Sequence, residues 1–406
     1  MQKKLVAIAV AGALGVPALA LAQTSTVNIY GKITYEYGRV DSGDGKRTTD
    51  YADSPGGSAI GFKGEESLGG GMSAWFQCES SADVRALDQT GFCTRNSALG
   101  FKGGFGNVFF GRWDTPMKQA MNVGTVGAEE TGILGNSFLP FGGSGGSNAS
   151  GSGNGTEIHG ESGQRQRWKR REAGMTNYVS PSFSGFQVMA SVSSGNGTDV
   201  SNGGSDALSN TPNAKPRVWS FAGVYNNGPL GIGLGYERHN QFGVFNAATT
   251  DLNDSAWGVS AAYTFGGKVK VGATYLDAKY ESSATTERKR SSWTVGVDWN
   301  ISGPHSIMGQ YANMGDTKGN DPTGIGGRIG GSNGGVGATG DNTGADSWTI
   351  AYKYAFSKRT EVKFGYLRVS NDSNTRLFRM GNSSGALLAP NGQDVDGYAM
   401  HISHRF

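Results

Sequence analysis

The sequence predicts an all-β fold, a single antiparallel β-barrel of sixteen strands that crosses a membrane. Three observations predict it. Apolar and polar residues alternate with a period of two in many segments, as they do in strands with one apolar and one polar face. Long polar connections alternate with tight turns along the chain, and tryptophan recurs at one end of several strands. Glycine is abundant, with 68 residues against 11 prolines, which favours many turns and closely packed strands.

The first 22 residues are predicted to be a secretory signal peptide. The stretch MQKKLVAIAVAGALGVPALALAQ has a basic start, an apolar run and the segment ALA at 20–22, which is the order of a signal with a cleavage site. A transmembrane anchor is the less favoured alternative, because Pro17 interrupts the run and no stop-transfer charges follow it. Residues 23–406 then form a single exported barrel domain.

The first strand shows the alternation clearly. In VNIYGKITYEYGRV, at 27–40, Ile29 and Tyr35 share an apolar face, and Lys32 and Thr34 lie on the polar one. The stretches SWTVGVDWNI and SWTIAYKYAF later in the chain follow the same rule. A two-residue period of this kind indicates strands that are apolar on one side and wet on the other.

Sixteen such strands are predicted. They cover residues 27–40, 58–68, 72–80, 93–102, 107–112, 167–179, 186–194, 218–226, 230–239, 255–265, 268–280, 291–301, 305–314, 346–356, 360–370 and 396–406. Long polar connections follow strands of odd rank, whereas tight turns such as GGG, GGFG, GPL, GGK and SGPH follow strands of even rank. This sorting is typical of an outer-membrane barrel and not of a soluble Greek-key sandwich.

Four strands that run from a long loop toward a tight turn begin with tryptophan. Each carries an aromatic residue six positions later on the same face, in the pairs Trp219 and Tyr225, Trp257 and Tyr263, Trp293 and Trp299, and Trp348 and Tyr354. Six residues span about 20 Å along a strand, so the rings are expected near the edges of a lipid-facing band about 25 Å tall. The alternative, aromatic packing inside a sandwich, does not require tryptophan at the loop end each time.

The composition agrees with apolar residues that face lipid. The hydrophobic fraction is only 36%, and the polar strand faces cannot form a dry core, so a barrel of about sixteen strands is expected to enclose water. No stretch after the signal has the roughly 18 apolar residues of a membrane helix. Removal of Lys3 and Lys4 lowers the formal net charge from +3 to +1, which predicts no nucleic-acid or other polyanion partner.

Cys78 and Cys93 are the only cysteines in the chain. In an exported protein such a pair favours a disulfide over a metal site. The pair flanks a short segment rich in turn formers between two predicted strands, so the two residues could face each other across a hairpin. Two separate reduced thiols are the alternative.

Six motifs in chain order carry a family resemblance: VNIYGKI, GFKGEESLGGG, GRWDTP, NYVSPSFSGF, YAFSKRT and the terminal HRF. With them the chain resembles the general porins of Gram-negative bacteria, specifically the trimeric sixteen-stranded group typical of β-proteobacteria. The resemblance covers essentially all of residues 23–406. It implies a homotrimer in the cell outer membrane and a third loop that folds into the barrel. It also implies that the final strand, with apolar residues at alternate positions back from Phe406, is read by the barrel-assembly machinery; an ordinary last strand is the alternative.

The resemblance further implies a pore constriction. The connection 113–166 is the longest in the chain and corresponds to the loop that narrows the pore in the family. Its first part carries Glu129 and Glu130. The family places arginines on the barrel wall opposite this loop, and Arg95 and Arg171 fall on such positions.

Other charged residues are also candidates for the constriction. Arg112 and Asp114 lie in the retained motif GRWDTP. In the second strand Ala59 stands where relatives often have arginine, whereas Lys32 and Lys353 point inward by alternation and supply positive charge instead. For each charged residue a solvated or loop-tip position is the alternative.

Arg95 poses a problem of side-chain direction. Strict alternation places it on the face of Leu99 and Phe101, so an inward position requires a bulge or a place above the lipid band. The basic run RQRWKRR that ends at Arg171 has a second interpretation, because its upper members are also suited to the phosphates of lipopolysaccharide.

The predicted function is passive diffusion of small hydrophilic solutes and ions. Opposed carboxylates and guanidiniums across a narrow aqueous gap create a transverse field that favours small polar solutes, here with a weak preference for anions. No enzyme, metal or cofactor is predicted: GIGGRIGG lies in a loop with no following helix, unlike a phosphate site, and the five histidines lack metal-ligand spacing. The alternative is a non-conducting outer-membrane barrel that acts as an adhesin or structural surface protein.

Overall fold

The computed structural model describes residues 27–41, 43, 58–82, 84, 92–128, 132, 134, 168–193, 217–240, 253–281, 283–320, 340–374 and 392–406, with the backbone of 48–53. Within these residues the chain forms eighteen strands and the helix α2 (Pro116–Gly124). The predicted signal peptide lies outside the described residues. Among the described residues, no helix is long and apolar enough to span a membrane.

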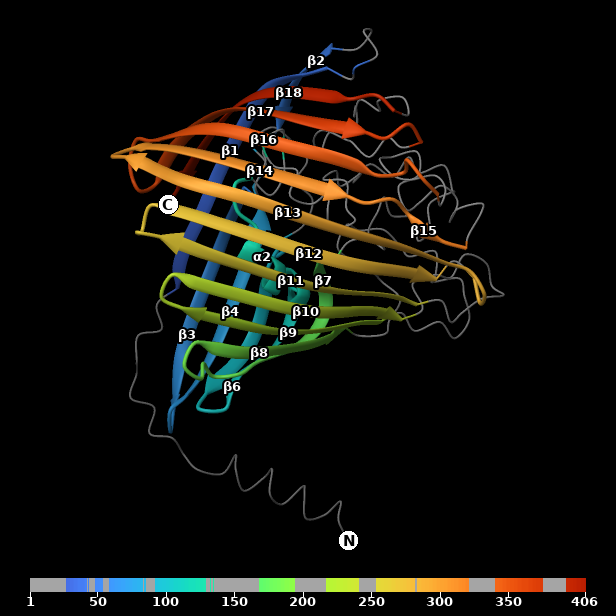
Figure 1. The fold of residues 1–406 in the computed structure, drawn as a ribbon. Coiled ribbons are helices and arrows are strands. Elements are labelled where there is room, and N and C mark those ends of the chain that lie inside the picture. Colours follow the sequence, from blue (N-terminus) through green and yellow to red (C-terminus); the bar gives the residue numbers. More distant parts are fainter. Residues whose placement is uncertain are drawn as a thin grey trace.

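Sixteen of the strands form one closed antiparallel ring (Figure 1). They are β1 (Asn28–Asp41), β3 (Ala59–Gly69), β4 (Met72–Ser81), β5 (Ser97–Gly103), β6 (Gly106–Asp114), β7 (Arg171–Val179), β8 (Phe186–Ser193), β9 (Arg217–Asn227), β10 (Leu230–Asn240), β11 (Asp254–Phe265), β12 (Val269–Glu281), β13 (Glu287–Ser302), β14 (His305–Met314), β16 (Ala345–Ala355), β17 (Thr360–Asn371) and β18 (Val395–Arg405). Each pairs with its neighbours in chain order, and β1 pairs with β18. The predicted fold is therefore confirmed.

The two ends of the barrel differ in their connections. Tight turns at 70–71, 104–105, 228–229, 266–268 and 303–304 join strands at one end, which we call the turn rim. The opposite end, where the long connections leave the strands, is the loop rim. Glycines at the tight turns, such as Gly70 with φ 60°, adopt the left-handed backbone that few other residues tolerate.

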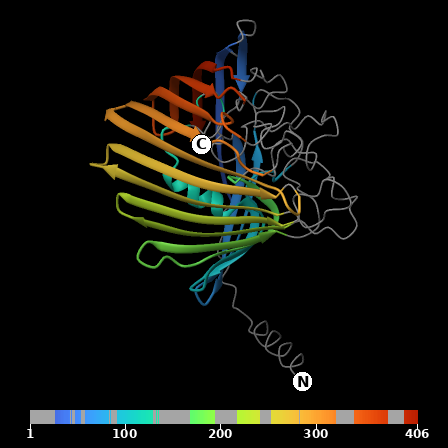
Figure 2. The same ribbon diagram turned by 45° about the vertical axis from the view of Figure 1, so that its right-hand side comes forward.

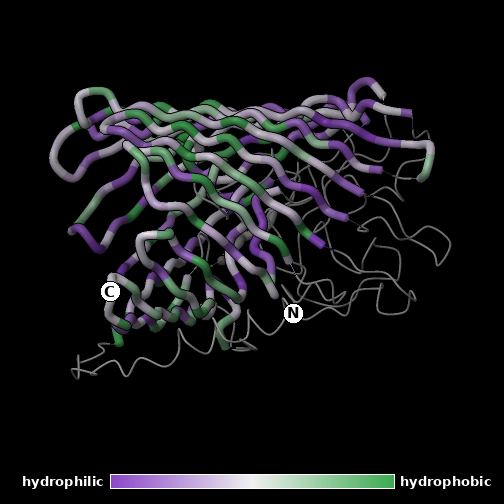
Figure 3. Tube along the Cα trace, turned by 90° about the horizontal axis from the view of Figure 1, so that it is seen from below, coloured by the Kyte–Doolittle hydropathy of each residue, from purple (hydrophilic) through white to green (hydrophobic). Residues whose placement is uncertain are grey.

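The apolar face of each strand points away from the barrel axis. On β1, Tyr35 and Tyr37 are 36% and 49% exposed, whereas Thr34 and Glu36 are fully buried. Figure 3 shows the hydrophobic and hydrophilic residues alternating along the strands. All exposed tryptophans of the chain lie on the outer wall of β9 to β16. The predicted direction of the strands, apolar outward and polar inward, is confirmed.

The strand limits differ from the predicted ones mainly at the loop rim. The fourth predicted strand, 93–102, begins only at Ser97, and the sixth, 167–179, begins at Arg171. In contrast, β13 begins at Glu287, four residues earlier than predicted, because it continues the ladder with β12 to the rim. Two short strands were missed: β2 (Thr48–Asp53) extends the sheet beside β1, and β15 (Lys318–Gly319) beside β13.

The helix α2 lies inside the ring of strands, as both Figure 1 and Figure 2 show. It follows directly on β6. Thr115 caps it by accepting a hydrogen bond from the backbone N–H of Lys118 (3.3 Å), and Pro116 occupies the first turn, where its missing N–H has no intrahelical partner to lose. The start of the third long connection therefore turns inward at the end of β6.

Candidate functional site

Two hydrogen bonds fasten α2 to the inner wall. The backbone N–H of Met117 donates to Oγ of Ser220 on β9 (3.0 Å), and Oγ of Ser260 on β11 donates to the carbonyl of Ala120 (2.6 Å). Met117, Ala120 and Met121 are fully buried in this contact. A helix held in this way occupies part of the cross-section of the barrel and narrows it.

Inward-facing glycines let the wall accept the helix at close range. A Cβ atom at Gly233 would lie 2.3 Å from the carbonyl oxygen of Ala120, and one at Gly296 would lie 1.8 Å from that of Val126. Both distances are far below van der Waals contact, so any side chain here would displace the loop. We call the glycines that meet α2 and the residues just after it the glycine bed: Gly231, Gly233, Gly235, Gly258, Gly272 and Gly296.

The far end of the same connection is also fastened inside the barrel. Trp168 is fully buried, its ring stacks on His239 with a centroid distance of 4.3 Å, and its Nε1 donates to the hydroxyl of Tyr280 (2.8 Å). The Nζ atom of Lys169 donates to Oγ1 of Thr125 (3.2 Å), just after α2. The two ends of the connection are therefore tied to the wall and to each other.

We expect Trp168→Ala to loosen this end of the connection. Truncation of a fully buried aromatic side chain costs about 3–5 kcal/mol, and here that loss falls on the attachment of the loop and not on the strand ladder. Single-channel recordings in planar bilayers should show more current noise and more frequent brief closures than the unmodified protein. Trp219→Ala, at a lipid-facing tryptophan of the outer wall, is the control and should leave the noise unchanged; equal noise in both variants contradicts the prediction.

Arg95 lies on the inner face of the wall near the loop rim. Its Nε atom is 2.7 Å from Oε1 of Glu79 on β4, and the hydroxyl of Tyr30 on β1 donates to the other oxygen of that carboxylate (3.2 Å). Tyr30 belongs to the inward face of β1, together with Thr34. The position before the strand solves the problem of alternation, because the residues ahead of Ser97 are not part of the ladder.

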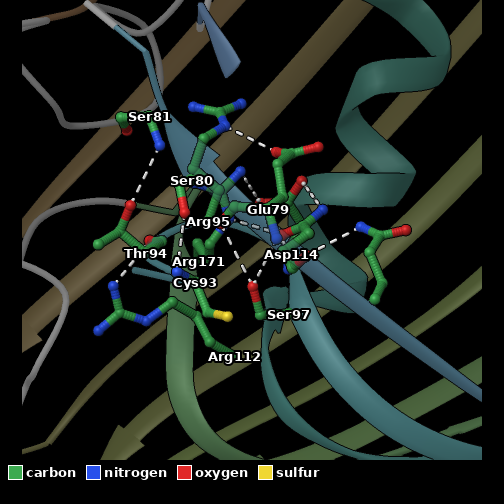
Figure 4. Close-up of polar contacts among 12 residues, drawn as sticks. Glu79, Ser80, Ser81, Cys93, Thr94, Arg95, Ser97, Arg112, Asp114 and Arg171 are labelled. Atoms are coloured by element: carbon green, nitrogen blue, oxygen red, sulfur yellow. Dashed lines mark hydrogen bonds and ion pairs between the residues drawn. The ribbon is translucent and has the colours of Figure 1, made fainter. Parts of the chain in front are cut away.

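A second group of charges surrounds Asp114, which Figure 4 shows in the same part of the wall as Arg95. The Asp114 carboxylate is 3.2 Å from Nη2 of Arg171 and 3.0 Å from Nζ of Lys118 on α2. Asn96 connects the partners, since its Oδ1 accepts from Nε of Arg171 (2.6 Å) and its Nδ2 donates to Asp114 (3.2 Å). The pairs are mostly buried, so salt screens them less than exposed pairs.

The structure brings four of the predicted constriction residues together. Arg95, Asp114 and Arg171 belong to the groups above, and Nη1 of Arg112 donates to the carbonyl of Thr94 beside them (2.8 Å). Their role in a constriction stays a prediction.

Lys353 lies elsewhere, near the turn rim, two residues from the end of β16. Lys32 lies on β1 two residues from Tyr30, and it pairs in register with Ala59, the first residue of β3, and with Arg405, the last residue of β18. Glu129 and Glu130 lie outside the described residues. The backbone of Phe406 exchanges two hydrogen bonds of 3.1 Å with Gly31 on β1, and its proposed reading by the assembly machinery stays a prediction.

Three residues of the site were not predicted from the sequence. Glu79 and Asn96 gave no signal, because the significance of each depends on partners from other strands. Lys118 lay in a stretch with only some helical potential. The glycine bed had a visible signal, since LGIGLGYER places glycine at every second position on the inward face of β10.

No group of three or more histidine, cysteine, aspartate or glutamate side chains suited to a metal ion occurs within the described ranges. Arg95, Lys118 and Arg171 are instead paired with the carboxylates of Glu79 and Asp114.

Comparison with known proteins identifies the family. A family model described as Gram-negative porin matches residues 6–374. The major outer membrane protein P.IB of Neisseria gonorrhoeae is 33% identical over 194 residues, which is 46% of this chain and 46% of that protein. The protein of the same name from Neisseria sicca is 35% identical over 150 residues, 35% of this chain and 39% of its own. The chain thus aligns with about half or less of the length of these curated relatives.

Solved structures share the fold over nearly the whole chain. The anion-selective porin from Comamonas acidovorans superimposes with a TM-score of 0.68 at 20% identity, covering 94% of this chain and 100% of that one. OmpT of Vibrio cholerae gives a TM-score of 0.62 at 16% identity, with 96% and 100% covered. At this level of identity the likeness concerns the fold alone.

Proposed function

The chain belongs to the Gram-negative porin family, and from this premise we propose that it is a general diffusion channel of the outer membrane. Small hydrophilic solutes and ions pass through a water-filled lumen without a covalent step and without a cofactor. The observation that carries the proposal is the helix α2 seated inside a barrel with a polar inner face. A barrel whose inner wall is polar holds water, and an inserted loop sets its narrowest cross-section.

The charges beside α2 support a weak preference for anions. Arg95, Arg112, Arg171 and Lys118 bring four positive charges to this part of the wall, against the two negative charges of Glu79 and Asp114. A surplus of cations at a narrow aqueous passage lowers the barrier for anions relative to cations. The structurally similar porin from Comamonas acidovorans is described as anion-selective, which agrees with this sign.

Planar-bilayer recording tests the proposal. Purified protein should give discrete openings on the nanosiemens scale, as expected of a porin-sized aqueous lumen. In a potassium chloride gradient the reversal potential should have the sign of weak chloride preference. Absence of openings contradicts the channel and favours the adhesin or structural barrel. Openings with a clear cation preference contradict the anion preference alone.

The outer wall supports a homotrimer. Exposed tryptophans anchor β9 to β16 at the lipid interface, whereas the outer wall of β1 and β3 to β8 has none and presents residues such as Ile60, Phe76, Leu99 and Phe101. A wall without interfacial anchors is suited to contact with neighbouring copies. A trimer form is known for OmpT of Vibrio cholerae. Lipopolysaccharide around the wall and the barrel-assembly machinery complete the proposed partners.

A further inference from the structure

The segment that carries Arg95 is held at the loop rim without a strand ladder. The ladder between β4 and β5 pairs Ser73 through Gln77 with Lys102 through Ala98 and stops there. Strand β4 continues to Ser81 with β3 on its other side. Residues 93–96 cover the remaining edge of β4 but do not belong to any strand.

A disulfide and individual hydrogen bonds replace the missing ladder. Cys78 on β4 is bonded to Cys93, and the backbone N–H of Cys93 donates to Oγ of Ser80 (2.9 Å). The N–H of Ser81 donates to Oγ1 of Thr94 (3.2 Å), and the N–H of Arg95 donates to the carbonyl of Glu79 (2.8 Å). The disulfide is the only covalent cross-link between this segment and β4.

The disulfide and the Arg95 side chain lie on opposite faces of the wall. Cys78 lies on the outward face of β4, together with the exposed side chain of Phe76. It pairs in register with Phe62 on β3, and the ring centroid of Phe62 is 6.3 Å from that of Phe92. The neighbouring residue Glu79 therefore points inward and meets Arg95. A link on the outside thus fixes the start of a segment whose arginine reaches the inside.

The residues next to Arg95 explain the change of face. Arg95 and Asn96 form bends ahead of Ser97, where the strand begins, so the alternation that would place Arg95 beside Leu99 and Phe101 on the lipid face does not extend to it. Cys93, two residues earlier, has a φ of +58° in the left-handed region, which residues other than glycine adopt at a cost. The disulfide fixes this residue to β4, and it thereby fixes the start of the segment whose arginine points inward.

The same segment also supports the second group of charges. Asn96 follows Arg95 directly, and it accepts from Arg171 and donates to Asp114. The Thr94 carbonyl accepts from Arg112 (2.8 Å). A displacement of residues 93–96 therefore moves Arg95 itself and the partners of two further arginines at once.

We infer that the Cys78–Cys93 disulfide is a selectivity-determining positioning element, which holds Arg95 on the inner face of the channel wall and so maintains the preference for anions. The inference rests on the proposed function. Removal of the link lets the segment relax toward ordinary strand alternation, in which Arg95 leaves the inner wall and Glu79 loses its partner. Both changes make the passage less positive.

The test compares reversal potentials of four proteins in a potassium chloride gradient. These are the unmodified trimer, Cys78→Ser/Cys93→Ser, Arg95→Gln, and the triple variant that combines them; the unmodified protein is also measured before and after a phosphine reductant on the loop side. Loss of the disulfide should lower the chloride-to-potassium permeability ratio about twofold, the order expected for removing one nearby charge in a watery passage. Reduction should have the same effect as the serine substitutions.

The Arg95→Gln background separates positioning from a general loss of structure. If the disulfide acts through Arg95, the serine substitutions should add no further shift to that of Arg95→Gln. A shift that adds fully in the triple variant, or identical reversal potentials with and without the disulfide, overturns the inference and leaves the proposed channel intact. A barrel without openings overturns both. The mobility of unheated trimers on gels confirms that each variant is folded before it is recorded.

Discussion

Gly233→Leu should reduce the single-channel conductance to about half or less, because a side chain of that volume fits only if α2 moves toward the lumen. The wall at Gly233 is held by ladders on both sides, whereas α2 is held by hydrogen bonds to Ser220 and Ser260. The helix is therefore the part that yields. Overpacking of this kind costs about 1–3 kcal/mol, which a barrel closed by continuous ladders tolerates. Conductance in planar bilayers measures the effect.

Gly223→Leu is the matched control for this variant. Gly223 lies on β9 but faces outward, where an added Cβ would first meet the ring of Phe186 at 3.3 Å. It adds the same volume to the lipid side of the adjacent strand, so the conductance should stay unchanged. A normal conductance in Gly233→Leu, with the protein folded and trimeric, would show that α2 does not define the narrow part of the passage.

Asp114→Asn and Arg171→Gln should shift the ion preference in opposite directions. The Asp114 carboxylate offsets the charges of Arg171 and Lys118 at 3.2 and 3.0 Å, so its neutralisation leaves the wall more positive and raises the chloride-to-potassium permeability ratio. Neutralisation of Arg171 lowers that ratio. Each shift should be about twofold or more. Reversal potentials in a salt gradient measure both.

The opposite signs make the test sensitive to charge and not to geometry. Both variants break the same ion pair, so a disturbance of structure alone would move the two reversal potentials in the same direction, and that outcome contradicts the prediction. Lys353→Gln removes a positive charge near the turn rim, away from α2. Its effect should be smaller than that of Arg171→Gln.

The fold was predictable because each strand carries its own signal. Alternation such as that of Tyr35 and Tyr37 against Thr34 and Glu36 needs no partner to be read, since lipid on one side and polar surroundings on the other impose it residue by residue. The predicted strand limits were wrong at the loop rim, where the strands no longer have lipid on one side and polar surroundings on the other. There β13 extends beyond its predicted start, and residues 93–96 leave the sheet.

For the candidate site, several of the residues were predictable but their arrangement was not. The direction of Arg95 depends on bends ahead of Ser97, outside the strand ladder, and the pairing of Arg171 with Asp114 depends on Asn96 from a third segment. Such arrangements arise from contacts across strands, which local periodicity does not contain. The two cysteines could be paired from their spacing and compartment, but their relation to Arg95 required the three-dimensional structure.

The seam between β1 and β18 determines the order in which this molecule can assemble. Every other ladder of the ring joins strands that follow one another, whereas the seam joins Gly31 to Phe406 across almost the entire polypeptide. Among the ladders of the ring, this one closes the largest loop and therefore has the greatest entropic cost. Until it forms, the sheet has two borders with unpaired backbone N–H and C=O groups, which favour aggregation. The pairing of β1 with β18 is thus expected to form last, and a sheet that lacks its last strand keeps both borders exposed.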